Sequence, residues 1–377
     1  MNMLFLVLAS INVVIWVFYG LLFFFNLKKK PIFRGNDCYD NEIIYPSLSV
    51  IIPACNEEES IRQAISQLLD QDYPDLEVIV VNDRSTDHTG FVVEELKIQY
   101  PQLKVVNITD LPPKWIGKNH AIYQGVKQAT GEWILFTDAD VMFSPSSLKK
   151  TVSYSLENEL DHLTITPDIT YKGFFYGGFI SFFIIVVTGF YLSSKSAGIG
   201  AFNLIKRSTY QEIGGYEAIA MQPVDDVSLG KLLVKKGYKQ SFGFSKGLIS
   251  VKLFDNLFAM MKGIEKNQFS STNYRVLPTL AFCCFILFLN VYPFIGLFFG
   301  SEWVRILCGF SIIILFAIYN YLKKYTDVSL MHVLIHPISA LLYFWAVLNS
   351  MVKILRRGGI EWRGTVYSLE ELKKHTF

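Results

Sequence analysis

Two aspartates, Asp138 and Asp140, are the residues of this sequence best placed to do chemistry. They follow residues 133–136 (Trp-Ile-Leu-Phe), an apolar run that predicts a short buried strand. Ligands of open α/β sheets collect at the carboxyl ends of the strands. A carboxylate pair at such an end suits a hard divalent cation, which prefers oxygen ligands and is commonly completed by substrate phosphates. Considered by itself, the pair is more typical of an ordinary turn, where aspartate is common.

Two further polar clusters follow apolar runs in the same way. Asn56 and Glu57 come after the run 48–53, and Asp83 comes after the run 76–81. Helical patterns lie between these runs, so strands and helices alternate with short connections. This alternation predicts an α/β domain with a mostly parallel sheet. Three polar clusters at one edge of a sheet favour a nucleotide site over three coincidental turns.

These clusters belong to a longer succession of motifs. The five pieces are Pro53-x-x-Asn56-Glu57, Val80-Val81-Asn82-Asp83, Asp138-x-Asp140, Ile213-Gly214-Gly215-Tyr216 and Val224-Asp225-Asp226. Each piece is weak, but their combination over residues 47–240 resembles the family-2 glycosyltransferases with a GT-A fold, a Rossmann-like α/β fold. The segments 115–121 (Trp-Ile-Gly-Lys-Asn-His-Ala) and 361–367 look like the membrane glycosyltransferases of bacterial carotenoid and hopanoid pathways.

The resemblance implies a role for the polar residues in moving a sugar from a nucleotide-sugar donor, by family habit a UDP-sugar. Asp140, with Asp138 beside it, would hold Mn²⁺ or Mg²⁺, which stabilises the negative charge of the leaving diphosphate. Lys118 would neutralise a phosphate, although its surroundings lack the spacing of a P-loop. The residues expected to bind the donor are Pro53, Ala54, Asn56, Glu57, Asp83, Lys118 and Asp138.

Asp225 and Asp226 are the candidate catalytic carboxylates. An acceptor hydroxyl needs a base as it attacks the sugar, and a carboxylate can serve. The resemblance assigns this role to Asp226, while Asp225 stands where the family usually has glutamate. The structural alternative is that the two residues cap the helix expected at 227–236.

The composition indicates a protein that resides partly in a membrane. Of the 377 residues, 51% are hydrophobic, and the mean hydropathy is +0.32. The net charge of +2 gives no indication of a nucleic-acid partner. The five cysteines show no Cys-x-x-Cys spacing, which disfavours a zinc site or a disulfide framework. The sequence gives no indication of the oligomeric state.

The apolar runs predict membrane segments on both sides of a soluble domain. Residues 3–27 are long enough to span a bilayer, and the lysines at 28–30 place the next domain in the cytoplasm, as expected for a multi-pass protein of a bacterial cell membrane. The expected boundaries are an anchor at 1–30, a linker at 31–46, a GT-A domain at 47–252, an amphipathic interface helix at 253–275, transmembrane helices at 276–352 and a basic tail at 353–377.

One apolar stretch, residues 173–192, interrupts the catalytic domain. A simple crossing there would put Asp138 and Asp226 on opposite sides of the membrane, so we expect an interfacial element that presents a lipid acceptor. At the other end of the chain, three full crossings would leave the tail outside, whereas its basic residues, Arg363 among them, favour an inside tail. A re-entrant hairpin at residues 336–337 (His-Pro) would remove this conflict.

The sequence therefore predicts a membrane-bound enzyme that transfers a sugar from a nucleotide sugar to a hydroxyl or carboxylate of a lipid, with inversion. A processive polysaccharide synthase is the alternative enzyme, but Lys266-Asn-Gln-Phe269 stands where such synthases carry Q-x-x-R-W. A non-catalytic membrane scaffold is the alternative from another class, and the intact carboxylates disfavour it. The sugar and the lipid are not specified by the sequence.

Overall fold

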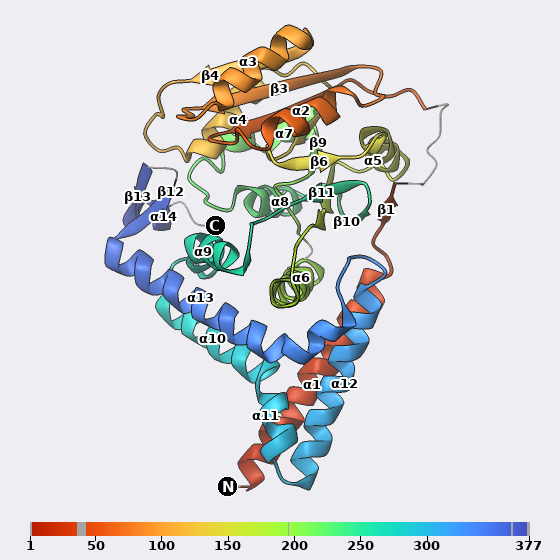
Figure 1. The fold of residues 1–377 in the computed structure, drawn as a ribbon, viewed down its shortest axis with the longest axis vertical. Coiled ribbons are helices and arrows are strands. Elements are labelled where there is room, and N and C mark those ends of the chain that lie inside the picture. The colour runs from red at the N-terminus through yellow and green to blue at the C-terminus, as the bar shows by residue number, and fades with distance from the viewer. Residues whose placement is uncertain (1, 36–42, 195, 363–364, 375–377) are drawn as a thin grey trace. The chain divides into compact units, whose positions relative to one another are not determined.

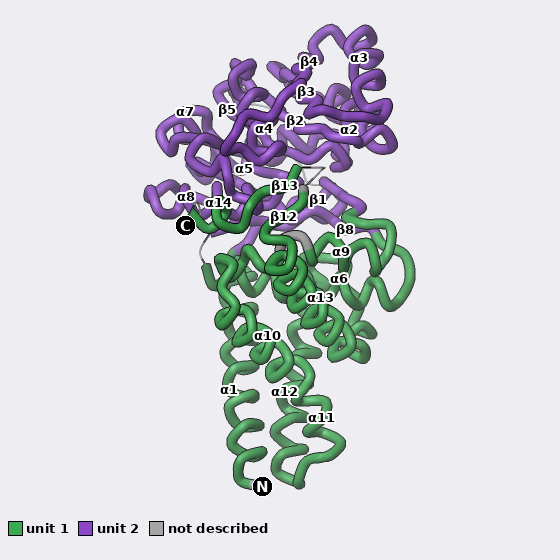
Figure 2. Tube along the Cα trace, turned by 90° about the vertical axis from the view of Figure 1, so that its left-hand side faces the viewer, with its two compact units in different colours: residues 1–29, 171–194, 253–376 green, residues 30–170, 195–252, 377 purple. Residues whose placement is uncertain are grey.

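The computed structural model describes residues 2–35, 43–194, 196–362 and 365–374. The chain divides into two compact units, which Figure 2 distinguishes by colour. The sheet unit contains residues 30–170 and 195–252, and the helical unit contains residues 1–29, 171–194 and 253–376. Part of the expected linker, residues 36–42, and Arg363 of the expected tail lie outside the described residues.

The sheet unit is built on a large, mostly parallel sheet. Strands β2, β3, β4 and β5 pair in parallel in the order β4-β3-β2-β5, and β1, β10 and β7 are parallel to one another. Strand β9 joins the two sets and runs antiparallel to both β5 and β7. The strands are β1 (Ile32–Arg34), β2 (Leu48–Ala54), β3 (Leu76–Asp83), β4 (Leu103–Ile108), β5 (Trp133–Phe136), β7 (His162–Thr166), β9 (Asn203–Lys206) and β10 (Gln240–Lys246).

The strands alternate with helices that bury their apolar faces on the sheet. The α-helices of this unit are α2 (Ile61–Leu69), α3 (Thr89–Gln99), α4 (Gly117–Gln128), α5 (Ser147–Glu157), α7 (Arg207–Glu212) and α8 (Asp225–Lys235). Helix α4 lies closely on β2 and β3, because a Cβ at Gly125 would come within 3.0 Å of side chains on both strands, Ile51 and Val81. This close approach fixes the position of the residues at the start of α4.

A smaller sheet begins directly after Asp138 and Asp140. Strand β6 (Val141–Phe143) begins directly after Asp140 and pairs antiparallel with β11 (Ile249–Val251), which pairs in parallel with β8 (Asp168–Ile169). The chain on both sides of Asp138 and Asp140 is thus held in a strand, with β5 before them and β6 after them. Asp140 lies in the turn between these two strands, and Asp138 lies just before that turn.

The α/β fold class predicted from the sequence is confirmed, with some changes at element boundaries. The expected linker contains β1, which pairs with β10 at the sheet edge. Helix α4 starts at Gly117, so Lys118 lies in its first turn. Strand β9 begins at Asn203, and a loop containing Gly198 and Gly200 precedes it.

The helical unit gathers three separate parts of the chain. Figures 1 and 2 show α1 and α12 side by side along their lengths, and α10 beside α13. Its helices and strands are α1 (Asn2–Leu27), α6 (Phe174–Ser194), α9 (Leu257–Asn267), α10 (Val276–Asn290), α11 (Tyr292–Phe299), α12 (Glu302–Leu322), the 3₁₀ helix η3 (Leu330–Ile335), α13 (His336–Arg357), β12 (Gly359–Trp362), β13 (Thr365–Ser368) and α14 (Leu369–Lys374).

Within the described residues, four helical segments are long and apolar enough to cross a membrane. They are residues 3–27, 174–194, 302–322 and 330–357, and a fifth is possible if the bent pair α10–α11 counts as one span. The expected hairpin at residues 336–337 is not formed in this part of the chain, since α13 begins at His336 and continues to Arg357. Proline is tolerated there because it lies in the first turn of a helix.

A buried polar network joins α1 to the break between α10 and α11. In an unbroken helix the carbonyl of Leu289 would accept from residue 293, but Pro293 has no N–H. The indole of Trp16 donates to this carbonyl instead, at 2.9 Å. Asn12 donates to the carbonyl of Phe288 at 2.7 Å and accepts from the hydroxyl of Ser311 on α12 at 2.8 Å. Helix α1 is therefore an integral part of the helical unit.

We predict that Asn12→Ala lowers the stability of the protein in detergent by about 1–2 kcal/mol, because it leaves buried polar groups of α10 and α12 without a partner. Asn26→Ala is the matched control on the same helix, since Asn26 donates only within α1, to the carbonyl of Leu22 at 3.1 Å. Thermal unfolding followed by circular dichroism measures both. Equal melting temperatures for the two variants would contradict the proposed importance of the network.

Candidate active site

The candidate site lies where the order of the parallel strands reverses. From β2 the chain proceeds to β3 and β4 on one side, and then returns to place β5 on the other side of β2. Open α/β sheets bind ligands outside the carboxyl ends of the strands at such a point. A recess with about 180 Å³ of empty space lies there, lined by Pro53, Lys118, Ile122, Phe136, Thr137, Asp138, Gly200, Asn203, Tyr216 and Asp225.

The ammonium group of Lys118 lies among the carboxylates of this recess. Its Nζ is 2.6 Å from Oδ1 of Asp138 and 3.9 Å from Oδ1 of Asp225. Burial by itself would lower the pKa of Lys118, but the charges of Asp138, Asp225 and Asp226 outweigh it and raise that pKa well above its usual value. Lys118 is therefore charged at every physiological pH. It joins the carboxylate after β5 to those at the start of α8.

Asp225 and Asp226 have different partners. The hydroxyl of Tyr216 donates to Oδ2 of Asp225 at 2.9 Å. Asp226 accepts from the backbone N–H of Gly200 at 2.9 Å and from that of Val227 at 2.8 Å. The carboxylate of Asp225 is thus turned to Tyr216 and Lys118 rather than capping α8, whose N-cap position is Val224. The plain capping alternative does not account for Asp225.

The pKa of Asp226 is raised to about 7, first by burial and then by the charge of Asp225, while Lys118 and the N–H of Val227 oppose the rise. A carboxylate that titrates near neutral pH is suited to accept a proton from an acceptor hydroxyl and to release it afterwards. The two hydrogen bonds that Asp226 accepts from backbone N–H groups fix the direction of its carboxylate.

Asn119 is a positioning residue that was not assigned from the sequence. Its side-chain amide donates to the carbonyls of Ile219, Ala220 and Gln222, at 3.0, 3.1 and 3.0 Å. It is 1% exposed, so these bonds are buried. Because Asn119 follows Lys118 on α4, the loop that leads to Asp225 is fixed to the same helix as the lysine. From the sequence, residues 115–121, which include Asn119, were identified only by their resemblance to membrane glycosyltransferases. The structure supplies a physical reason for the asparagine.

Two glycines before β9 were also missed. A Cβ at Gly200 would lie 2.7 Å from Oδ2 of Asp138 and 3.3 Å from Nζ of Lys118. A Cβ at Gly198 would overlap the carbonyl of Asp226. The backbone of this loop therefore approaches the carboxylate of Asp138 and the main chain of Asp226 as only glycine allows. The Gly-x-Gly spacing is the sequence signal that would have found them.

Asp140 lies beside Asp138 in a field of negative charge. Its pKa is raised to about 6 by burial, then by the charge of Asp138 and then by that of Glu57. No three His, Cys, Asp or Glu side chains in the described residues are placed to hold a metal by themselves. Carboxylates that repel one another fit a divalent cation whose other ligands come from the phosphates of a bound donor.

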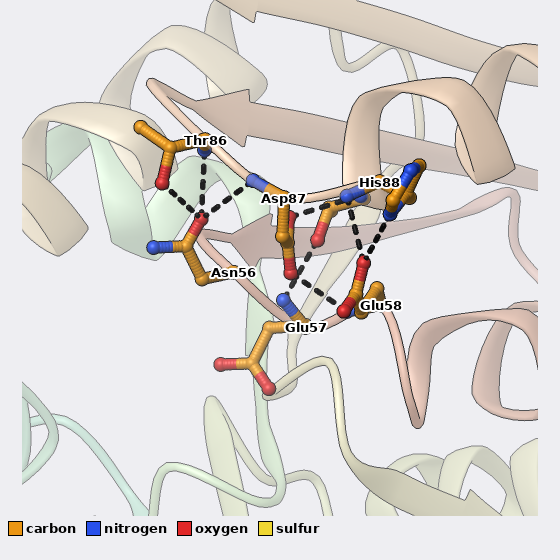
Figure 3. Close-up of polar contacts among 7 residues, drawn as sticks. Asn56, Glu57, Glu58, Thr86, Asp87 and His88 are labelled. Atoms are coloured by element: carbon orange, nitrogen blue, oxygen red, sulfur yellow. Dashed lines mark hydrogen bonds and ion pairs between the residues drawn. The ribbon is translucent and has the colours of Figure 1, made fainter.

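Asn56 and Glu57 belong to a loop that is tied to the loop after β3, as Figure 3 shows. The side-chain oxygen of Asn56 accepts from the N–H of Thr86 at 2.8 Å, and the N–H of Glu57 donates to the hydroxyl of Thr89 at 2.7 Å. Asn56 has a φ of 58°, a conformation that asparagine tolerates better than most residues. The carboxylate of Glu57 points away from this network. Asn56 thus shapes the loop, and Glu57 faces the charged cluster.

Asp83 ends β3 next to the start of α4. It is 3% exposed, and its two oxygens accept from Nε and a terminal nitrogen of Arg84 at 2.7 and 3.0 Å. A Cβ at Gly117 would lie 2.8 Å from Oδ2 of Asp83, so the carboxylate reaches the first turn of α4. Ala54, the last residue of β2, is buried and pairs with Asn82. Arg84 is a further residue at this edge that was not singled out from the sequence.

The strand order and the reversal point are those of a GT-A fold. Residues 49–214 match the model of the family "Glycosyl transferase family 2". Most of the sheet unit therefore matches this family of glycosyltransferases, and the recognition made from the motifs is confirmed.

Relatives extend the similarity beyond the sheet unit. The "4,4'-diaponeurosporenoate glycosyltransferase" of Staphylococcus aureus strain bovine RF122 / ET3-1 is 25% identical over 341 residues, which cover 87% of this chain and 90% of the relative. The protein of the same name from strain MRSA252 is 24% identical with the same coverage. The solved structure of mannosyltransferase PcManGT from Pyrobaculum calidifontis, in complex with GDP-Man and Mn2+, matches 93% of this chain and 99% of its own, with 18% identity and a TM-score of 0.57.

We predict that Lys118→Met lowers the stability of the metal-free protein by about 2 kcal/mol, because it leaves carboxylates to repel one another without a cation. The loss should be larger at pH 8 than at pH 6, where more of the carboxylates are protonated, and added Mn²⁺ should reduce it. Thermal unfolding measures each effect.

Lys97→Met is the matched control for this variant. Lys97 lies 3.9 Å from Glu94, both side chains are 49% exposed, and exposed pairs contribute little. A melting temperature for Lys118→Met that equals that of the control, at both pH values, would show that the cluster does not depend on the lysine.

Proposed function

We propose that this protein is a membrane-bound glycosyltransferase that moves a sugar from a nucleotide-sugar donor to a lipid acceptor, with a divalent cation and with inversion at the sugar. The observation that carries the proposal is the convergence of Lys118, Asp138, Asp225 and Asp226 at the reversal point of the sheet. The helical unit of the same chain, with its long apolar helices, supports membrane residence.

Each residue has a role in the proposed reaction. Mn²⁺ or Mg²⁺, held by Asp140 and Asp138, would act as a Lewis acid toward the diphosphate. On donor binding, Lys118 turns its charge from Asp138 to the donor phosphates, because the phosphates are also negative and the lysine stem is flexible. Asp83 and the loop of Pro53, Ala54, Asn56 and Glu57 surround the nucleoside side of the donor.

Asp226 accepts the proton of the attacking group, and Asp225 sets the pKa of Asp226. Because Asp225 raises the pKa of Asp226, the base is strong enough to take a proton near neutral pH. Tyr216 and Gly200 hold the two carboxylates in fixed directions, at 2.9 Å each. An acceptor carboxylate is already deprotonated, so it needs no base. Asp226 would then orient the acceptor through a shared proton, or it would stay neutral.

The membrane placement of α6 follows from the course of the chain. The sheet unit includes the residues before α6 and the residues after it. A helix that crossed the bilayer once would leave these two parts of one folded unit on opposite sides. Figure 1 shows α6 end-on while α1 and α12 of the same unit run lengthwise, so α6 is oriented across that pair. We therefore place α6 in the interface, with the sheet unit on the cytoplasmic side of a bacterial membrane.

The substrate class is drawn from the relatives. The diaponeurosporenoate glycosyltransferases are named for an acceptor whose name denotes an apolar carboxylate. A lipid with a hydroxyl or carboxylate is accordingly the proposed acceptor here. A UDP-sugar is the proposed donor, and GDP-sugars belong in the same test because a mannosyltransferase with a similar fold is titled as a complex with GDP-Man.

The direct test is release of nucleoside diphosphate by the detergent-purified protein, with UDP- and GDP-sugars, Mn²⁺ or Mg²⁺, and a bacterial lipid extract. We expect release that needs both the cation and the lipid, and we expect Asp140→Asn and Asp226→Asn to reduce it by about a hundredfold or more. Asp110→Asn, an exposed aspartate on the loop after β4, serves as the control.

The outcomes separate the competing functions. Full activity of Asp140→Asn or Asp226→Asn would refute the assigned roles. A long polymer as product would indicate a polysaccharide synthase, and no release by folded protein under any condition would indicate a scaffold.

We predict that transfer to a hydroxyl acceptor rises with pH through about 7, because Asp226 must lose its proton to act as a base. In Asp225→Asn the charge that contributes most to the raised pKa of Asp226 is gone. The rise in transfer rate should therefore move to lower pH. The pH profile of kcat/KM for the two proteins measures the shift. Identical profiles would mean that the titrating group is not Asp226.

A further inference from the structure

The helical unit contains a recess that is separate from the residues assigned to sugar transfer. It lies among α9, α13 and β12 and has about 610 Å³ of empty space that opens to solvent. Its lining residues are Lys262, Glu265, Lys353, Ile354, Arg357, Gly359, Ile360 and Glu361. All of them belong to the helical unit.

The charges of the recess leave cations available to a ligand. Glu265 is 7% exposed, and its oxygens already accept from Lys353 and from the amide of Asn349. This buried carboxylate is therefore neutralised within the fold. Arg357 is paired with Glu361 at 3.3 Å, but both side chains are more than half exposed, so water or an anion can replace the carboxylate.

Lys262 supplies the third positive charge. It is exposed, and its ammonium group lies 4.7 Å from the centre of the Phe258 ring on the same helix. A cation–π contact at the surface is worth little and leaves the donors of the ammonium group free to bind an anion. Lys262 and Arg357 thus present positive charge from two elements, α9 and α13, to one recess.

The recess lies at the basic end of a helix that is long and apolar enough to cross a membrane. The span of residues 330–357 ends at Arg356 and Arg357, and Lys353, Ile354 and Arg357 from its last turns line the recess. Another face of α13 carries exposed apolar side chains, as expected for a helix in contact with lipid, namely Ile338, Leu341, Trp345, Val352 and Leu355. The head group of a lipid at this end of the helix would lie within reach of the recess.

We propose that the recess among α9, α13 and β12 binds the phosphate group of an anionic membrane lipid. Basic pockets at the ends of membrane helices recognise lipid head groups in this way, and arginine binds phosphate with two parallel hydrogen bonds. The inference depends on the proposed membrane residence but not on the catalytic roles of the aspartates. It assigns a function to the segment after α13, which the sequence indicated only as a basic tail.

The test is native mass spectrometry of the full chain in neutral detergent, titrated with dioleoylphosphatidylglycerol and, separately, with dioleoylphosphatidylcholine. We expect phosphatidylglycerol to bind more tightly, and we expect the double variant Lys262→Gln, Arg357→Gln to weaken its binding about tenfold or more. Glu361→Gln should strengthen binding, because Arg357 then loses its competing carboxylate.

Lys324→Gln is the matched control. Lys324 is also an exposed lysine over a nearby aromatic ring, 5.3 Å from the centre of Tyr321 at the end of α12, but it does not line the recess. Its variant should bind phosphatidylglycerol as the parent protein does.

Three outcomes would overturn the proposal. The first is equal binding of the two lipids, and the second is binding that the double variant and Glu361→Gln leave unchanged. The third is displacement of phosphatidylglycerol by inorganic phosphate at the same concentration, which would identify a site for free phosphate instead of a lipid. The melting temperature of each variant is recorded. The double variant Lys262→Gln, Arg357→Gln is expected to weaken lipid binding, and Glu361→Gln is expected to strengthen it. A general loss of folding cannot imitate these opposite changes.

Discussion

The structure of the candidate site depends on one half-buried cation, the ammonium group of Lys118. Lys118 is in contact with the carboxylate that follows β5 and lies near the carboxylate that begins α8. Without it, Asp138, Asp225 and Asp226 would lie close together with no compensating charge, and burial raises the cost of charging Asp226. The ammonium group of Lys118 thus stabilises this cluster of acids in the absence of substrate. A metal ion and a phosphate donor require the same cluster. Lys118 is also mobile enough in principle to turn to a phosphate, since the lysine stem is flexible.

The remaining features of the site hold these charged side chains in position. Asn119 joins the helix of the lysine to the loop before α8 through buried hydrogen bonds. Gly200 brings a backbone N–H to Asp226 and leaves space for Asp138. Helix α4, held closely to β2 and β3 at Gly125, supplies a fixed base for both Lys118 and Asn119. The positions of the acids therefore follow from packing on the sheet rather than from a loop.

The sequence was sufficient for the fold class, the family and the residues that carry charge, because these depend on local patterns. The strand at 133–136 has the predicted bounds, and the aspartates follow it as expected. What the sequence did not provide were the interactions between distant segments. The bond from Asn119 to residue 220 and the approach of Gly200 to Asp138 depend on how α4, β9 and α8 pack. The strand β1 in the expected linker was missed for the same reason, since three residues form a strand there only because β10 offers an edge.

The loop before β9 connects the site to the sheet in the same way. The N–H of Gly200 donates to Asp226, and three residues later the chain enters β9. Strand β9 pairs antiparallel with both β5 and β7, so it cannot slide without disturbing the sheet. The sheet therefore fixes one end of the loop that carries Gly198 and Gly200. The direction of the Asp226 carboxylate thus depends on the pairing of β9 as well as on the helix that carries Asp226.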